Sequence, residues 1–212
     1  MKITKFGHCC LLIEENGVRI LTDPGIYSTS QNEVKDIDLI IITHEHPDHF
    51  HLDSLKIVTQ NNPAAKIITN KGVGALLDKE GISHEVVEDG QNYSFHDLLI
   101  EGFGKNHAPI YPTVPSVINT GYFIANKFFY PGDALTNPNK PVEILALPVV
   151  GPWLKIAEAI DYAKSLKPKI CFPVHDGMLR PERIGPVHKL PEAVLAPAIK
   201  FVVLAEGVAT EL

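Results

Sequence analysis

Six consecutive residues decide the fold of this chain: His44-Glu45-His46-Pro47-Asp48-His49. They follow residues 38–43, an apolar run bounded by polar residues that predicts a buried strand. A strand that ends in a turn no longer directs alternate side chains to opposite faces, and Pro47 stiffens that turn by fixing its own φ. The three histidines and Asp48 are therefore expected to converge. Imidazole nitrogens and a carboxylate suit zinc, manganese or iron, so the segment predicts a metal site rather than a solvated polar loop.

The six residues resemble the H-x-H-x-D-H signature of the metallo-β-lactamase superfamily. Further segments resemble that family in order along the chain: Gly7-His8, Leu21-Thr22-Asp23-Pro24, His107, Gly132-Asp133 and Pro173-Val174-His175-Asp176-Gly177. The resemblance covers about residues 3–180 and is closest to the lactonase-like and uncharacterised hydrolase branch. It implies an α+β fold, a four-layer αββα sandwich with a metal site at one edge between the sheets.

The same resemblance implies a dinuclear centre. Its first ion would be bound by His44, His46 and His107, its second by Asp48, His49 and His175, and Asp133 would bridge them. The cofactors are then two divalent ions, zinc or alternatively manganese. Each ion keeps room for water or substrate, which distinguishes a catalytic from a structural site. Asp48 is the expected catalytic residue, because it can bind the second ion and also hold the nucleophile in line.

Two further residues, His8 and Asp23, are expected near the metal cavity, where they would orient ligands through hydrogen bonds. The alternatives are a turn that starts a loop for Asp23 and a satisfied strand histidine for His8. The other histidines lack partners at ligand spacing and are interpreted as structural; of these, His188 is the rival to His175. Four loop residues are interpreted as packing or surface residues rather than substrate contacts: Tyr111, Trp153, Arg180 and Arg183.

Composition limits the remaining possibilities. With 212 residues, one domain over residues 1–212 is expected, and 45% hydrophobic with 21% charged residues is ordinary for a globular protein. A net charge of −6 argues against a nonspecific nucleic-acid partner. No apolar stretch has transmembrane length, and the opening residues lack the apolar run of a signal peptide. The three cysteines include no C-x-x-C pair, which favours reduced thiols and a cytoplasmic location. The oligomeric state stays open.

Hydrophobic periodicity predicts many strands first and mixed elements afterwards. Strands are expected over residues 2–6, 9–14, 18–22, 37–43, 66–69, 83–88, 91–104, 119–125, 127–130, 142–147, 170–174 and 201–204. Helices are expected over residues 52–60, 71–80, 155–166 and 190–199. Turn residues at Glu15-Asn16-Gly17 and Asn126 predict two hairpins.

The predicted function is metal-dependent hydrolysis, in which a dinuclear centre activates hydroxide against a small anionic ester, either a lactone or a phosphoester. One alternative is a phosphodiesterase or nuclease on the same centre. The other is a non-catalytic metal-binding regulatory module, which an incomplete ligand set would favour. Hydrolysis of β-lactams is not expected, because Asp133 stands where the best-known β-lactamases place a cysteine.

Overall fold

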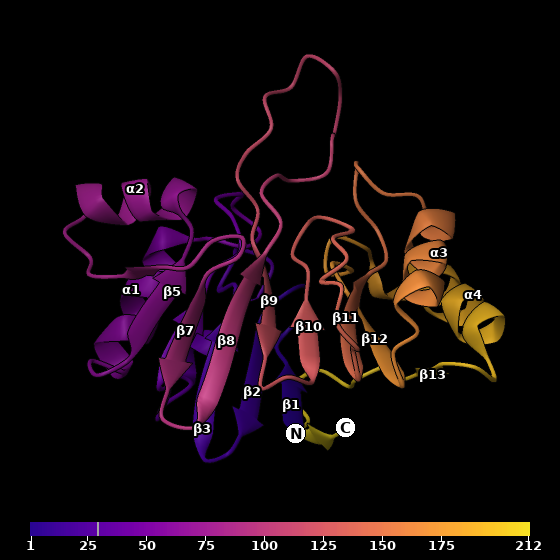
Figure 1. The fold of residues 1–212 in the computed structure, drawn as a ribbon, viewed down its shortest axis with the longest axis horizontal. Coiled ribbons are helices and arrows are strands. Elements are labelled where there is room, and N and C mark those ends of the chain that lie inside the picture. Colours follow the sequence, from indigo (N-terminus) through magenta and orange to yellow (C-terminus); the bar gives the residue numbers. More distant parts are fainter. Residues whose placement is uncertain (29) are drawn as a thin grey trace.

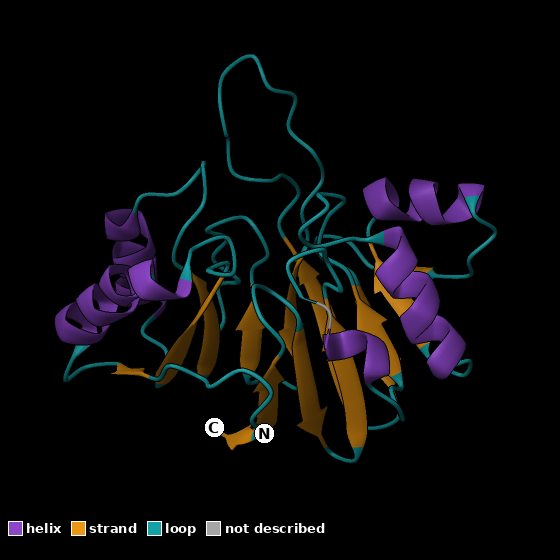
Figure 2. Ribbon diagram, turned by 180° about the vertical axis from the view of Figure 1, so that it is seen from behind, coloured by secondary structure: helices purple, strands orange, loops and turns teal. Residues whose placement is uncertain are grey.

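Two seven-stranded sheets face each other in the computed structural model, which describes residues 1–28 and 30–212. One pair of helices covers the outer face of each sheet, so the molecule has four layers (Figures 1 and 2). The predicted αββα sandwich is confirmed. No helix in the described parts of the chain combines the length and the apolar character needed to cross a bilayer.

The first sheet has the order β14-β1-β2-β3-β4-β5-β6. Its strands are β1 (Lys2–Lys5), β2 (Leu11–Glu15), β3 (Val18–Thr22), β4 (Leu39–Ile41), β5 (Lys66–Thr69), β6 (Glu85–Val86) and β14 (Thr210–Glu211). The short helix η1 (Ser30–Glu33) and helices α1 (Leu52–Asn61) and α2 (Lys71–Lys79) belong to this half. Asn70 caps α2, because its side chain accepts hydrogen bonds from the backbone N–H groups of Gly72 and Val73.

The second sheet has the order β13-β12-β11-β10-β9-β8-β7. Its strands are β7 (Asn92–Phe95), β8 (Leu98–Phe103), β9 (Gly121–Ile124), β10 (Phe128–Tyr130), β11 (Ile144–Pro148), β12 (Ile170–Val174) and β13 (Lys200–Phe201). Helices α3 (Ile156–Leu166), η2 (Pro181–Arg183) and α4 (Gly185–Leu195) complete this half.

Three apolar layers separate the four layers of secondary structure. Ile3, Tyr122 and Phe172 belong to the layer between the sheets. A second cluster joins α1 and α2 to the first sheet, and a third joins α3 and α4 to the second sheet. Adjacent Cys9 and Cys10 contribute to different layers and are both free thiols. Burial of apolar side chains on both faces of each sheet is the main stabilising contribution here.

Most predicted elements are confirmed, although the short elements β14, η1 and η2 were not predicted. The main differences among the predicted elements concern four of them. Residues 91–104 form two strands, β7 and β8, because the chain turns at His96, where φ is 49°. The second strand begins at Leu11 rather than at residue 9, since Gly7 to Cys10 forms a hydrogen-bonded turn. The last helix runs over Gly185–Leu195 rather than 190–199, with proline in its first turn, where the missing N–H costs little. The final predicted strand is reduced to Lys200–Phe201.

The strand directions place one set of loops together. β1 and β3 are each antiparallel to β2, and β3 is parallel to β4. In the second sheet, β8 and β10 are each antiparallel to β9, and β10, β11 and β12 are parallel. The loops that follow β1, β3 and β4, and those that follow β8, β10, β11 and β12, therefore each leave one edge of their sheet. All the predicted site residues lie in these loops.

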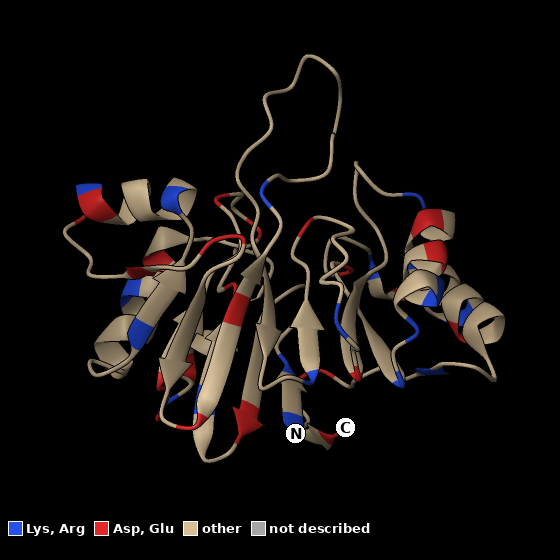
Figure 3. Ribbon diagram, in the orientation of Figure 1, with Lys and Arg blue, Asp and Glu red and all other residues tan. Residues whose placement is uncertain are grey.

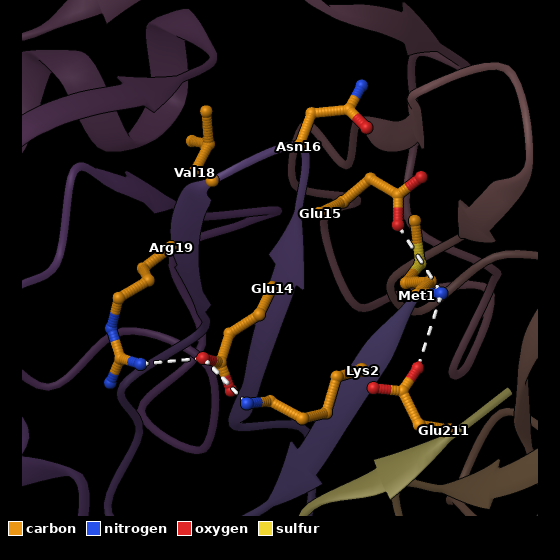
Figure 4. A pocket seen from close by; sticks show the side chains of 9 residues that line it. Met1, Lys2, Glu14, Glu15, Asn16, Val18, Arg19 and Glu211 are labelled. Carbon is orange, nitrogen blue, oxygen red and sulfur yellow. Dashed lines mark hydrogen bonds and ion pairs between the residues drawn. The ribbon is translucent and has the colours of Figure 1, made fainter.

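A separate open hollow lies away from these loops, beside the two chain termini (Figures 1 and 4). Its volume is about 420 Å³, and the charged groups that line it pair with one another. Glu14 contacts Lys2 at 3.1 Å and Arg19 at 2.7 Å, while the amino group of Met1 lies 3.4 Å from Glu15 and 3.7 Å from Glu211. These ion pairs satisfy the lining charges, and partly exposed pairs such as Lys2–Glu14 contribute little stability.

Gly25 provides a test of how tightly the turn after β3 packs on the metal-binding segment. A Cβ added at Gly25 would lie 1.8 Å from the carbonyl oxygen of Asp48. We therefore expect Gly25→Ala to lower the free energy of unfolding by roughly 1–3 kcal/mol, the usual range for overpacking. Gly185→Ala is the matched control, because within the described residues an added Cβ there meets nothing within 4 Å. Urea denaturation measures both; equal midpoints for the two variants would contradict this packing.

Candidate metal centre

All seven predicted ligands come together at the loop edge of the sandwich, in two groups of four that include His8. The first group contains His44, His46, His107 and Asp133, and the second contains His8, Asp48, His49 and His175. Within each group the candidate ligand atoms lie within 4.8 Å of one another. Residues separated by up to 167 positions in sequence thus form one buried cluster of imidazoles and carboxylates.

Asp133 joins the two groups. Its Oδ2 lies 3.3 Å from Nε2 of His107 in the first group and 2.8 Å from Nε2 of His175 in the second. Its Oδ1 lies 3.1 Å from Nε2 of His49, also in the second group. Oδ2 thus contacts both groups and Oδ1 contacts the second, so this carboxylate lies between the two groups, where a bridging ligand would lie.

The segment from Thr43 to His49 is held by backbone contacts from several elements. The Thr43 carbonyl accepts hydrogen bonds from the Asn70 side chain at 2.7 Å and from the Thr120 N–H at 3.0 Å, which join it to both sheets. The turn itself closes through the His49 N–H, which donates to the His46 carbonyl at 2.9 Å. The turn is therefore fixed by the fold before any ligand binds.

Asp23 is fully buried beneath this turn and accepts four hydrogen bonds. The Thr43 N–H donates to Oδ1 at 2.8 Å and the Thr43 hydroxyl to Oδ2 at 2.7 Å. Nδ1 of His49 donates to Oδ2 at 2.7 Å, and the Tyr130 hydroxyl donates to the same oxygen. Asp23 binds the Nδ1–H of His49 and so directs Nε2 of the same ring toward Asp133. This is the geometry of a carboxylate that orients a metal-binding histidine.

Several buried polar atoms in the cluster have no hydrogen-bond partner among the described residues. They are Nε2 of His49, Nε2 of His107, both ring nitrogens of His175 and Oδ1 of Asp133. Nδ1 of His107 donates to the Ala108 carbonyl at 2.5 Å, which leaves the Nε2 lone pair free. Buried polar groups without partners are costly, and these all face the same cluster. The donor set therefore fits divalent cations.

The pKa shifts follow from burial and from the two carboxylates. Burial lowers the pKa of His44 well below its ordinary value, which favours the neutral form that binds metals. Burial also opposes charge on His175, yet Asp133 outweighs it and raises the pKa of His175 to about 10. The pKa of Asp133 is well below its usual range, because the neighbouring His49 and His175 outweigh its burial. A cation in the cluster would replace these protons, so metal affinity is expected to fall in acid.

His8 lies within the second group, but its hydrogen bonds fix its tautomer. The Gly177 N–H donates to Nδ1 of His8 at 3.2 Å, so Nδ1 is an acceptor and Nε2 carries the ring hydrogen. Nε2 then donates to Oδ2 of Asp48 at 3.1 Å. Burial lowers the pKa of His8 to about 4, in keeping with this neutral form. A protonated Nε2 does not bind a metal, so the geometry is that of a group that positions Asp48.

Two contacts of Asp133 were missed in the sequence. Nε1 of Trp153, in the loop after β11, donates to Oδ2 of Asp133 at 2.9 Å, a contact with a candidate ligand that the interpretation of Trp153 as a packing or surface residue did not include. Asn119 accepts the Asp133 N–H at 2.9 Å and donates to the Pro131 carbonyl at 2.9 Å, which fixes the Gly132-Asp133 turn. The only indication in the sequence for either residue was that the single tryptophan lies in a predicted loop.

His188, the rival to His175, lies outside both groups. Its Nε2 contacts Oδ2 of Asp176 at 2.8 Å, and Oδ1 of the same carboxylate pairs with the buried Lys5 at 2.5 Å. These contacts anchor the turn after His175 to β1. Arg180 lies just before η2 and Arg183 is its last residue; both are exposed, as is Tyr111 on the loop after β8.

Comparison with known proteins agrees with this geometry. A family model described as the beta-lactamase superfamily domain matches residues 2–175. The chain belongs to the metallo-β-lactamase superfamily. Protein Rv0786c of Mycobacterium tuberculosis is 34% identical over 190 residues, which cover 87% of this chain and 88% of the relative. A UPF0173 protein of Pyrococcus abyssi is 32% identical over 186 residues, with 84% of each chain covered.

Solved structures show the same fold. Igni18, a metallo hydrolase from Ignicoccus hospitalis, has a TM-score of 0.78 and 25% identity, and the match covers 100% of this chain and 98% of that one. The metallo-beta-lactamase fold protein YhfI of Bacillus subtilis has a TM-score of 0.74 at 14% identity, covering 100% of this chain and 98% of that one. At such low identity the second likeness concerns the fold alone.

The tautomer of His8 gives a prediction that separates a positioning group from a ligand. At saturating zinc, His8→Ala is expected to keep the metal content of the wild type, while hydrolysis falls about 10–100-fold, the usual cost of losing a group that orients a ligand. His175→Ala, which removes a candidate ligand from the same group, is expected to lose metal. Elemental analysis and turnover are measured on both variants. Equal metal loss would show that His8 is itself a ligand.

Proposed function

We propose that this metal-dependent hydrolase uses two divalent ions, zinc or manganese, to cleave a small anionic ester. The observation that carries the proposal is the position of Asp133, whose two oxygens contact candidate ligands of both groups. In this proposal His44, His46 and His107 hold the first ion, Asp48, His49 and His175 hold the second, and Asp133 bridges them. When bound, such ions lower the pKa of a water molecule and stabilise the oxygens of an ester as it reacts.

The protein's own residues supply orientation and proton acceptance. Asp48 is about one-fifth exposed, with an exposed side-chain fraction of 18%, whereas Asp133 is at 3%, so Asp48 is the carboxylate that solvent and substrate reach. Its pKa is below the usual range, because the nearby His175 ring, with Nε2 3.4 Å from Oδ2, and the hydrogen bond from His8 outweigh its partial burial. Ionised Asp48 can accept a hydrogen bond from an attacking water and hold it in line. Trp153 holds the carboxylate of Asp133, and Asn119 holds its backbone N–H.

A lactone or phosphoester is proposed as substrate, since a pair of cations attracts an anionic ester. Relatives from Carboxydothermus hydrogenoformans and Methanosphaera stadtmanae carry the name metal-dependent hydrolase, which supports hydrolysis without specifying a substrate. The three buried free thiols support the proposed reducing, cytoplasmic location. The test is a panel of lactones, phosphodiesters and thioesters, with metal-loaded wild type compared with Asp133→Ala. Turnover of phosphodiesters alone would favour the phosphodiesterase alternative, and turnover of none would favour the regulatory module.

Two ions per chain are expected after reconstitution with zinc or manganese, because both groups offer sets of buried donors. His107→Ala removes one donor from the first group and is expected to lower the metal content toward one ion. The matched control is His84→Ala, since His84 contacts the Ile82 carbonyl and belongs to neither group. Elemental analysis measures all three proteins. A wild-type content of one ion or fewer after reconstitution would contradict the dinuclear centre.

Asp48→Asn tests whether Asp48 has a role beyond metal binding. Asparagine keeps the shape but loses the charge, so the variant is expected to fold, to bind the second ion more weakly and to turn over more slowly even at saturating metal. The lower rate follows because the amide is a poor proton acceptor, and general-base groups contribute typically about 10²–10⁴-fold. Turnover is measured against metal concentration. Full recovery at saturating metal would restrict Asp48 to ligand binding.

A further inference from the structure

The loop between β8 and β9 projects farther from the sandwich than any other segment in Figure 1. It spans residues 104–120, and the candidate ligand His107 lies near its start. The His107 N–H donates to the Val117 carbonyl at 3.0 Å and so closes the base of the loop. Pro109, Pro112 and Pro115 restrict the backbone beyond that base, which favours an open loop over a collapsed one.

A hollow of about 140 Å³ lies against the inner side of this loop. Two of its lining residues are the candidate metal ligands His46 and His107, and the rest are loop residues, among them Ile110, Tyr111 and Val114. Because His46 and His107 belong to the first group of donors, a molecule in the hollow is next to the metal centre. The hollow thus borders the proposed reaction site through these two histidines.

The hollow has no charged lining. Residues 106–126 contain no lysine, arginine, aspartate or glutamate, and beyond the blue segment at its base the projecting loop is tan in Figure 3. Tyr111 is 63% exposed and Val114 is 47% exposed. A charged group on a substrate would therefore lose water here without gaining an ionic partner, whereas an apolar group would gain from burial.

Apolar side chains on neighbouring loops extend this character around the centre. Ile26 and Tyr27 follow β3, and Met178 follows the turn at His175; each is at least 40% exposed. The ring of Tyr27 lies 5.2 Å from that of His8, so this side chain also borders the cluster. Single exposed apolar residues are ordinary, but these three gather on loops that carry site residues.

We infer that the hollow is a substrate subsite that binds an apolar acyl or alkyl group of the ester, while the ester itself lies at the metal centre. This inference rests on the proposed hydrolase function and specifies its substrate: the charge lies at the ester end and the remote end is apolar. The subsite is formed by the loop from Ala108 to Val117. The subsite contributes to binding by removing apolar area from water. Each methylene of the ligand therefore adds a similar amount of binding free energy until the hollow is full.

Unbranched alkyl carboxylates from acetate to octanoate test the subsite without requiring turnover. Their carboxylate is the metal-binding end, and calorimetry on the metal-loaded protein measures their affinity. Affinity is expected to rise with chain length by up to about fourfold per methylene, which is the equilibrium equivalent of roughly 0.8 kcal/mol per buried methylene. Val114→Asn is expected to reduce this dependence on chain length. Val208→Asn is the matched control, because Val208 is 53% exposed near the C-terminus and does not line the hollow.

The outcomes separate the subsite from the proposed function. Affinity that does not change with chain length in the wild type overturns the subsite, even if esters are hydrolysed. An unchanged dependence in Val114→Asn also overturns it, because the apolar gain then arises elsewhere. A clear dependence on chain length with no ester hydrolysed keeps the subsite and overturns the hydrolase proposal. Binding to phosphatidylcholine vesicles that Val114→Asn abolishes, without any chain-length dependence, would assign the loop to a membrane surface instead.

Discussion

The buried carboxylate of Asp23 is the contact on which the metal-binding edge depends. It belongs to the turn after β3, yet it accepts hydrogen bonds from Thr43 after β4 and from Tyr130 at the end of β10 in the other sheet. A buried charge is costly unless its hydrogen bonds are satisfied, and here four donors satisfy it. By holding Nδ1 of His49, the same carboxylate directs Nε2 toward Asp133. One side chain thus links the turns of the two sheets and sets the direction of the candidate ligand His49.

Backbone strain is concentrated at the same edge. His8, Asp23 and His175 all have positive φ, at 39°, 37° and 62°, in a region that non-glycine residues seldom adopt. Hydrogen bonds between distant turns offset this cost: the His175 N–H donates to the His8 carbonyl at 3.2 Å, and Gly177 reaches the ring of His8. An added Cβ at Gly177 would lie 2.9 Å from Cβ of His8, so the close approach requires glycine. Strained turns here hold side chains in directions that regular strands do not allow.

Local sequence patterns predicted most of the secondary structure because the elements bury regular apolar faces. Helices near 52–60 and 71–80 and the strand over Ile170–Val174 have clear periodicity, and the turn at Asn16-Gly17 has the positive φ that its residues favour. The hairpin turn at His96 was missed, because His96-Asp97 interrupts an otherwise strand-like stretch with no glycine or proline. The last helix was predicted at the wrong position, because a proline can stand either in the first turn of a helix or just after its end, and composition does not distinguish the two.

By itself, the sequence determined most of the secondary structure and the superfamily, because strand periodicity and a dense ligand motif are local properties. The resemblance to that superfamily then implied the four layers and the seven residues that meet at one edge. Only the tertiary structure decided how those residues face one another. The tautomer of His8 depends on Gly177, the orientation of Asp133 depends on Trp153 and Asn119, and the apolar hollow depends on the shape of the loop after β8. Each involves atoms far apart in the chain, and the direction of a hydrogen bond or the volume of a hollow is set by packing that residue spacing does not encode.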